Sequence, residues 1–218
     1  MSYSEYMREA NLIDGKWVQA DNGKTFSVIN PATSEIVGVV PASSSIETKR
    51  AILAASEAFP KYSTKPLLER VDLLWNLHDA LLDNKENLAE LLTVEQGKPL
   101  AEATGEILIG AAYIRWFAEE IRRNKGEIVP ASAKDRRILV TKHAVGVVGM
   151  ITPWNFPSSM LARKIGPALA TGCTIVAKPA SATPYSGLAW GALCEEAGFP
   201  KGVVNILTGP ASEIGSAI

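Results

Sequence analysis

The stretch that decides the fold covers residues 146–181 and reads GVVGMITPWNFPSSMLARKIGPALATGCTIVAKPAS. Its start belongs to an apolar, valine-rich run over residues 145–151, which predicts a strand buried on both faces. Pro153 ends this strand because proline has no N–H to donate to a neighbouring strand. A helix is predicted over residues 158–170, and Gly172 closes it.

A second apolar strand is predicted over residues 174–177, so the pattern is strand, helix, strand. Right-handed crossover connections place two such strands parallel in one sheet. The polar residues Asn155, Lys178 and Ser181 follow the ends of these strands. In open α/β sheets ligands bind at the carboxyl ends of the strands. The pattern therefore predicts a ligand crevice at this edge.

The same alternation continues with a helix over residues 184–197 and a strand over residues 203–207. Five alternating elements predict an α/β fold that is the first half of a doubly wound parallel, Rossmann-like sheet. The sequence ends at Ile218, inside the pattern of a further helix. We expect such a half sheet to have an unpaired edge and a partly bare face.

The sequence before this unit predicts a small antiparallel sheet followed by helices. The short strands are expected at residues 12–19, 26–30 and 36–40. The helices are expected at residues 44–59, from Pro66 to 82, at 85–96 and at 101–124. Ser44 and Glu47 form a capping-box pattern at the start of the first helix.

A β-hairpin is predicted between the helices and the parallel unit. Residues 128–129 and 138–140 are apolar and flank the charged turn at residues 134–137. Exposed apolar strands tend to pair with other chains, so we expect this arm to pack against a second subunit. The predicted domains are thus residues 1–126, an oligomerisation hairpin at 127–144, and the dinucleotide-binding half at 145–218.

Composition narrows the class of protein. The 218 residues are 47% hydrophobic and 21% charged with a net charge of −1, which gives no reason to expect a nucleic-acid partner. No apolar run approaches the roughly 20 residues that cross a membrane. The polar N-terminus has no signal-peptide core, and Cys173 and Cys194 form no disulfide pattern. We expect a cytoplasmic protein.

Each candidate site residue has an ordinary structural alternative. Asn155 suits a turn, but its amide can also donate to an anionic intermediate. Lys178 is either a solvated lysine or a cation that contacts a phosphate or sugar hydroxyl, and Ser181 either caps the next helix or contacts the same ribose. Arg163 is either a surface residue or a ligand for a substrate carboxylate.

Other reactive side chains have no partner pattern in the sequence. Cys173 and Cys194 have small or apolar neighbours, as buried structural cysteines do. His78 and His143 stand alone without metal-ligand spacing, so no metal site is expected. The glycine-rich dinucleotide fingerprint and the phosphate-binding loop motif are both absent from the sequence.

Several longer motifs carry a family resemblance. Seven motifs together span nearly the whole chain: TPWNFP, LARKIGPALATGCTIVAKPAS, TPYSGLAW, GVVNILTGP, LIDGKWV, INPATSEIVGVVP and EQGKPLAEATGEI. This combination closely resembles the aldehyde dehydrogenase superfamily, and within it the succinate-semialdehyde dehydrogenase group. The resemblance implies oxidation of an aldehyde, here succinate semialdehyde, to a carboxylic acid with NAD or NADP after attack by a cysteine thiolate.

The resemblance also implies roles for individual residues. Asn155 matches the residue that stabilises the oxyanion, and Arg163 matches an arginine that holds the distal carboxylate of the substrate. The residues implied for cofactor binding are Ile151, Thr152, Pro153, Trp154, Asn155, Lys178, Pro179, Ala180, Ser181 and Gly209. Many NAD-preferring relatives carry glutamate at the position of Ser181. Serine there removes a charge that repels a 2′-phosphate, so we expect NADP to be accepted. The hairpin matches part of a family oligomerisation arm, which implies a homo-oligomer when the protein is full length.

The chain departs from the family in length. Family members are roughly twice as long, beyond the size of an ordinary single domain. Their nucleophilic cysteine and their glutamate base match nothing in these 218 residues. We therefore expect a fragment of an aldehyde dehydrogenase that is inactive alone. The alternative is a truncated, non-catalytic protein that binds dinucleotide or partner subunits.

Overall fold

The centre of the molecule is the predicted parallel β-α-β-α-β unit. The structure, a computed structural model, describes residues 3–218. The unit consists of β7 (Val147–Ile151), α5 (Ser159–Thr171), β8 (Thr174–Lys178), α6 (Pro184–Glu196) and β9 (Val204–Ile206). Both neighbouring strand pairs are parallel, and Gly172 ends α5 in the left-handed conformation. The α/β fold and the order of its elements are therefore confirmed.

The early strands divide between two sheets. β1 (Asn11–Ile13) and β2 (Lys16–Val18) join the main sheet, whose order is β2-β1-β9-β8-β7. β3 (Thr25–Ile29) and β4 (Ile36–Pro41) form the small antiparallel sheet. The expectation that all early strands form one small sheet is wrong, whereas the expected unpaired edge is present at β7, the last strand in that order. Every residue of β1 is buried, so this strand suits an internal position beside β9.

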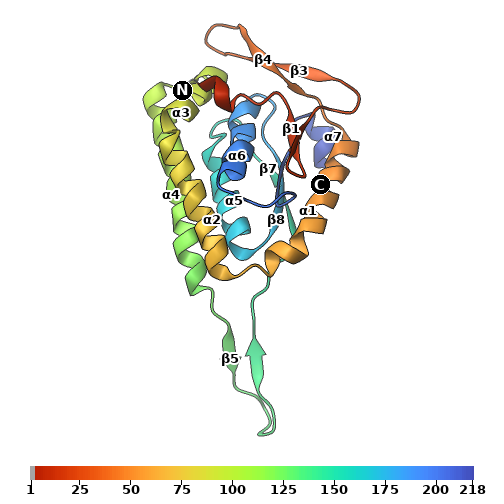
Figure 1. Cartoon of the computed structure of the whole chain (residues 1–218), viewed down its shortest axis with the longest axis vertical. Coiled ribbons are helices and arrows are strands. Elements are labelled where there is room, and N and C mark those ends of the chain that lie inside the picture. Colours follow the sequence, from red (N-terminus) through yellow and green to blue (C-terminus); the bar gives the residue numbers. More distant parts are fainter. Residues whose placement is uncertain (1–2) are drawn as a thin grey trace.

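Helices cover both faces of the main sheet (Figure 1). They are α1 (Ser45–Ser63), α2 (Leu67–Asp83), α3 (Lys85–Gln96), α4 (Leu100–Glu120) and the short α7 (Ala211–Gly215). The 3-10 turns are η1 (Tyr3–Tyr6) and η2 (Ile121–Arg123). Between Tyr3 and Ile218, none of the helices has the length and apolar character needed to cross a membrane.

The two faces of β8 lie in different apolar cores. Ile175 and Ala177 belong to the larger core, which α2 to α6 share. Val176 points into a smaller core with Leu207 and Ile214, beneath α1 and α7. α1 covers much of the second face from a distant part of the sequence, and this face stays partly bare at β7, where Ile151 is 49% exposed.

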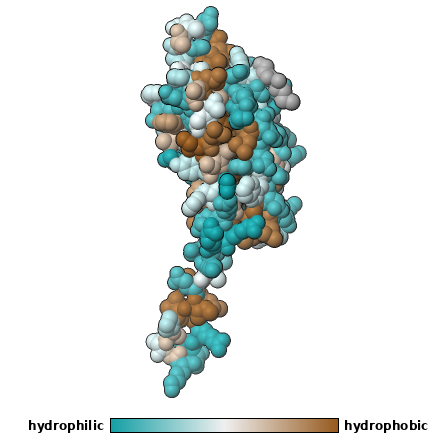
Figure 2. Space-filling view, turned by 90° about the vertical axis from the view of Figure 1, so that its left-hand side faces the viewer, coloured by the Kyte–Doolittle hydropathy of each residue, from teal (hydrophilic) through white to brown (hydrophobic). Residues whose placement is uncertain are grey.

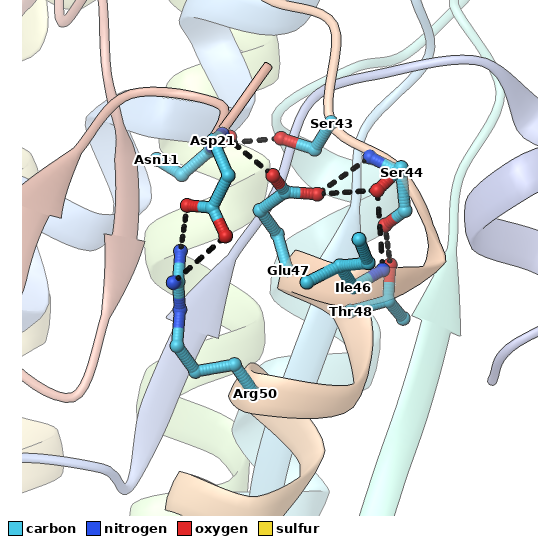
Figure 3. Close-up of polar contacts among 8 residues, drawn as sticks. All are labelled: Asn11, Asp21, Ser43, Ser44, Ile46, Glu47, Thr48 and Arg50. Carbon is cyan, nitrogen blue, oxygen red and sulfur yellow. Dashed lines mark hydrogen bonds and ion pairs between the residues drawn. The ribbon is translucent and has the colours of Figure 1, made fainter.

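The start of α1 has the predicted capping box (Figure 3). The Ser44 hydroxyl oxygen accepts a hydrogen bond from the Ile46 N–H, and Glu47 accepts one from the Ser44 N–H. Burial alone would raise the pKa of Glu47, but hydrogen bonds from the backbone of Asp21 and Ser44 hold the pKa at about 2. The helix continues to Ser63, beyond the predicted end at residue 59.

The predicted hairpin projects from one end of the molecule (Figure 1). β5 (Glu127–Val129) and β6 (Ile138–Val140) pair in antiparallel fashion. Ile128 is 78% exposed and Leu139 is 68% exposed. Figure 2 shows apolar side chains gathered on this arm, away from the body of the molecule. The hairpin is confirmed, whereas its contact with a second subunit and the domain limits at 126 and 144 stay predictions.

Candidate active site

The ends of the three parallel strands meet at one edge of the sheet. Ile151 and Lys178 are partners in the register of β7 and β8, and the Thr152 N–H donates to the Lys178 carbonyl oxygen at 3.2 Å. The Ser181 hydroxyl donates to the carbonyl oxygen of Gly209, beyond β9, at 3.3 Å. Asn155 follows β7 by four residues. The predicted convergence of the strand ends is therefore present.

Lys178 is a buried lysine, with 2% of its surface exposed. Its ammonium donates to the Pro179 carbonyl oxygen at 3.0 Å, and it pairs with no carboxylate in residues 3–218. Burial lowers the pKa of this lysine. The alternative of a solvated surface lysine is wrong. An ammonium has three donors, so this site fits a ligand rich in oxygen, such as a ribose.

Ser181 lies beside a cavity of about 350 Å³. Trp154, Ser181 and Thr183 line one side, and residues of β3 line another. The Thr183 hydroxyl is buried without a hydrogen-bond partner in the part of the chain described here. The Ser181 hydroxyl donates to the Gly209 carbonyl oxygen and does not cap α6. The alternative that Ser181 is a helix cap is therefore wrong. The cavity beside Ser181 therefore has room for a ligand.

The cap of α6 comes instead from a buried glutamate on α3. The Glu95 carboxylate accepts hydrogen bonds from the N–H groups of Tyr185 at 2.8 Å and Ser186 at 2.6 Å. Burial raises the pKa of Glu95 to about 7, despite these hydrogen bonds. Glu95 was not among the site residues expected from the sequence. The available signal was its place on the buried stripe of the helix, seven residues after Leu88.

A second buried glutamate caps α5. Glu106, on α4, accepts hydrogen bonds from the N–H groups of Ser158 and Ser159 at 2.9 and 3.0 Å. In glycine-rich dinucleotide folds the N-terminus of such a helix binds the pyrophosphate. Here carboxylates of the protein occupy the starts of both α5 and α6. This accounts for the missing glycine-rich fingerprint and excludes those two positions as phosphate sites.

Asn155 has a fixed backbone and a free side chain. Its carbonyl oxygen accepts a hydrogen bond from Lys98 at 3.1 Å. Its side chain is exposed, and the side-chain amide makes no hydrogen bond to any of the residues 3–218. A free amide beside a sheet edge is able to donate to a ligand oxygen.

Arg163 lies on the second turn of α5, the helix that follows Asn155. Its guanidinium donates to the Tyr113 hydroxyl at 2.7 Å and stands over the Tyr113 ring, 5.0 Å from the centroid. The side chain is exposed and pairs with no carboxylate within the described residues. An oriented, unpaired guanidinium suits a bidentate contact with an anion.

The two cysteines are structural, as their neighbours predicted. Cys173 and Cys194 are both buried and unpaired. Burial raises the pKa of the Cys194 thiol, which disfavours its thiolate. His78 packs edge-on against Trp75 and contacts Asp79, also in a structural role. The hydrogen bonds and ring contacts of these side chains involve none of Asn155, Lys178 and Ser181.

An α/β sheet with a polar crevice beyond its strand ends places the chain among the open α/β proteins, which bind their ligands at this edge. The chain belongs to the aldehyde dehydrogenase family, whose model matches residues 17–218. It is 50% identical to a glutarate-semialdehyde dehydrogenase of Pseudomonas aeruginosa, over 99% of this chain and 44% of that protein.

Two further proteins that resemble this chain are succinate-semialdehyde dehydrogenases. The chain is 46% identical to the NADP(+) succinate-semialdehyde dehydrogenase of Escherichia coli, over 99% of this chain and 45% of that protein. It superposes on the crystal structure of succinate-semialdehyde dehydrogenase from Burkholderia pseudomallei with a TM-score of 0.97 and 48% identity, covering 98% of this chain and 44% of that one. The chain thus spans less than half the length of these relatives.

Proposed function

We propose that the full-length protein oxidises an aldehyde with a distal carboxylate, such as succinate or glutarate semialdehyde, to the carboxylic acid. Membership of the family supports the reaction, and the names of similar proteins support the substrate. The observation that carries the proposal is the free Asn155 amide on the loop that leads into the helix of Arg163. The attacking thiolate comes from a part of the protein outside these 218 residues.

The cofactor we propose is NADP or NAD, which accepts the hydride when bound. The buried Lys178 ammonium fits a hydrogen bond to the ribose that carries the adenine. We assign the backbone of residues 151–154 and 179–180 to the neighbouring wall of the crevice, and Gly209 to its far side beyond β9. A side chain at Gly209 would meet the Ser43 backbone at 2.5 Å, so only glycine permits this close approach.

Asn155 and Arg163 contact opposite ends of the aldehyde. The Asn155 amide donates a hydrogen bond to the aldehyde oxygen as that oxygen gains negative charge. The Arg163 guanidinium holds the carboxylate at the other end of the substrate. Two fixed contacts orient the carbonyl carbon toward the attacking group.

Arg163→Met should lower kcat/KM for succinate semialdehyde about 10- to 100-fold, because a charge-assisted hydrogen bond contributes about 1.5–3 kcal/mol. Steady-state kinetics of the full-length protein measure this. Butanal, which has no carboxylate, should show less than a 3-fold change. Lys164→Met, at the neighbouring exposed position of α5, is the matched control and should leave kcat/KM unchanged for both aldehydes. Equal losses with both aldehydes would show that Arg163 does not bind the carboxylate.

Ser181→Glu should raise the KM for NADP about 10-fold or more and leave the KM for NAD nearly unchanged. A carboxylate at this position repels the 2′-phosphate and accepts hydrogen bonds from ribose hydroxyls. Ser181→Gln has the same size without the charge and should affect both cofactors alike. A full-length protein that already prefers NAD strongly would refute the proposal that Ser181 permits NADP.

We also propose that the hairpin packs against a second copy of the chain. The double variant Ile128→Lys/Leu139→Lys places two charges on its exposed apolar surface and should shift the full-length protein to smaller species by light scattering. Ile36→Lys, at a 66% exposed position on β4, is the control and should leave the assembly intact. A wild-type monomer would contradict the proposal directly.

A further inference from the structure

We propose that Lys98 and Glu106 form a positioning pair that sets the backbone of the loop carrying Asn155. The inference rests on the proposed function, because it assigns a role toward the oxyanion donor of that reaction. Lys98 and Glu106 are positioning residues, since neither is proposed to touch the substrate.

The pair is buried and close. The Lys98 ammonium lies 2.5 Å from a carboxylate oxygen of Glu106, and their side chains are 9% and 1% exposed. A buried ion pair is weak evidence for stability, because desolvation of the two charges offsets their attraction. Its other contacts are therefore the guide to its role.

Those contacts all reach one short segment, residues 155–159. Lys98 donates to the carbonyl oxygen of Asn155 at 3.1 Å, and its ammonium stands 4.3 Å from the centroid of the Phe156 ring. Through its second oxygen, Glu106 accepts from the N–H groups of Ser158 and Ser159. The pair thus holds both the start of the segment and its entry into α5.

The loop has little else to hold it in place. Trp154 is 59% exposed and Phe156 is 45% exposed, so burial of side chains does not fix the backbone of residues 153–156, although Pro157 after them is buried. An oxyanion donor must stay within about 0.5 Å of its productive position. With the Asn155 carbonyl anchored on Lys98, its side-chain amide stays unpaired and exposed. The anchor therefore supplies an order that the loop's own packing does not.

A plain structural role gives a different expectation. If the pair only capped α5, loss of Lys98 would lower stability and the folded fraction, and each folded molecule would keep its rate. If Lys98 positions Asn155, the rate per folded molecule falls. The two roles also differ in how Lys98 and Asn155 combine, because residues that act as one unit are not additive.

The test uses the full-length protein with Lys98→Met, Lys98→Arg, Asn155→Ala and the double variant Lys98→Met/Asn155→Ala. Single-turnover formation of NADPH is measured with enzyme in excess and corrected for the folded fraction by circular dichroism. Lys98→Met should slow this step about 100-fold, because a misplacement of about 1 Å has an effect of that size. The KM for NADP should change less than 2-fold, and Lys98→Arg, which keeps a cationic donor, should recover most of the rate.

In the Asn155→Ala background, Lys98→Met should slow the step by less than 3-fold more. A full additional 100-fold loss, or an unchanged rate per folded Lys98→Met molecule, would overturn the inference.

If Lys98→Met does not fold, the variant Glu106→Gln provides the test, because it removes the ion pair with Lys98 and keeps an acceptor for Ser158 and Ser159. It should slow the step about 10-fold and speed amide exchange over residues 155–159, and no change in either would overturn the inference. Full activity of Asn155→Ala would instead refute the proposed role of Asn155 itself.

Discussion

Asn155→Ala in the full-length protein should lower kcat by about 100- to 1000-fold, as the loss of one oxyanion donor does. The structure gives the reason in two observations. The backbone of Asn155 is anchored by Lys98, and the side-chain amide has no partner among the described residues. An unpaired, exposed amide loses little on removal, so the stability of the fold should stay within about 0.5 kcal/mol of wild type.

Two variants separate donation from shape. Asn155→Asp keeps the size of the side chain but replaces the donor with an acceptor, so it should lose at least as much activity as Asn155→Ala. Asn22→Ala removes an exposed turn asparagine before β3 and should change kcat less than 2-fold. If Asn155→Ala lowers only the affinity for cofactor, with kcat intact, the oxyanion role is wrong.

The second large effect concerns the 218-residue chain by itself, which should form no NADPH in the presence of aldehyde. The reaction needs a thiolate, and both cysteines in this chain are buried, with the pKa of Cys194 raised by burial. Catalysis that remains after loss of a covalent nucleophile is small. Absorbance of NADPH under excess semialdehyde measures the outcome.

The control is the double variant Cys173→Ser/Cys194→Ser, which should be as inactive as the unchanged chain. Aldehyde-dependent NADPH formation that this variant abolishes would assign a nucleophile within the 218 residues and contradict the prediction. An inactive chain that nonetheless forms stable oligomers through the hairpin would favour the alternative of a non-catalytic, subunit-binding protein.

The parallel unit was predictable because its signals are local. Apolar runs of four to seven residues, Pro153 and Gly172 mark each boundary within a few residues of its true position. The positions of Asn155 and Lys178 follow from the rule that parallel strands end at one edge. Roles for individual residues came from the family resemblance, since an asparagine in a turn has no signature of catalysis in the sequence.

What the sequence did not reveal depends on contacts between distant segments. Leu12 pairs with Ile206, and α1 covers the sheet face from the first third of the chain. Periodicity describes the buried stripe of a helix but not the surface it meets. Glu95 and Glu106 were missed for the same reason, because an acid on a buried stripe shows its partner only after folding.

The carboxylates that cap α5 and α6 have a consequence for the protein between turnovers. Glu106 and Glu95 accept hydrogen bonds from the first N–H groups of α5 and α6, and both acceptors belong to the same chain as the helices. The first N–H groups of these two helices therefore have acceptors without a bound phosphate. We expect that binding and release of a dinucleotide would leave these N–H groups paired, because their acceptors are side chains of the protein.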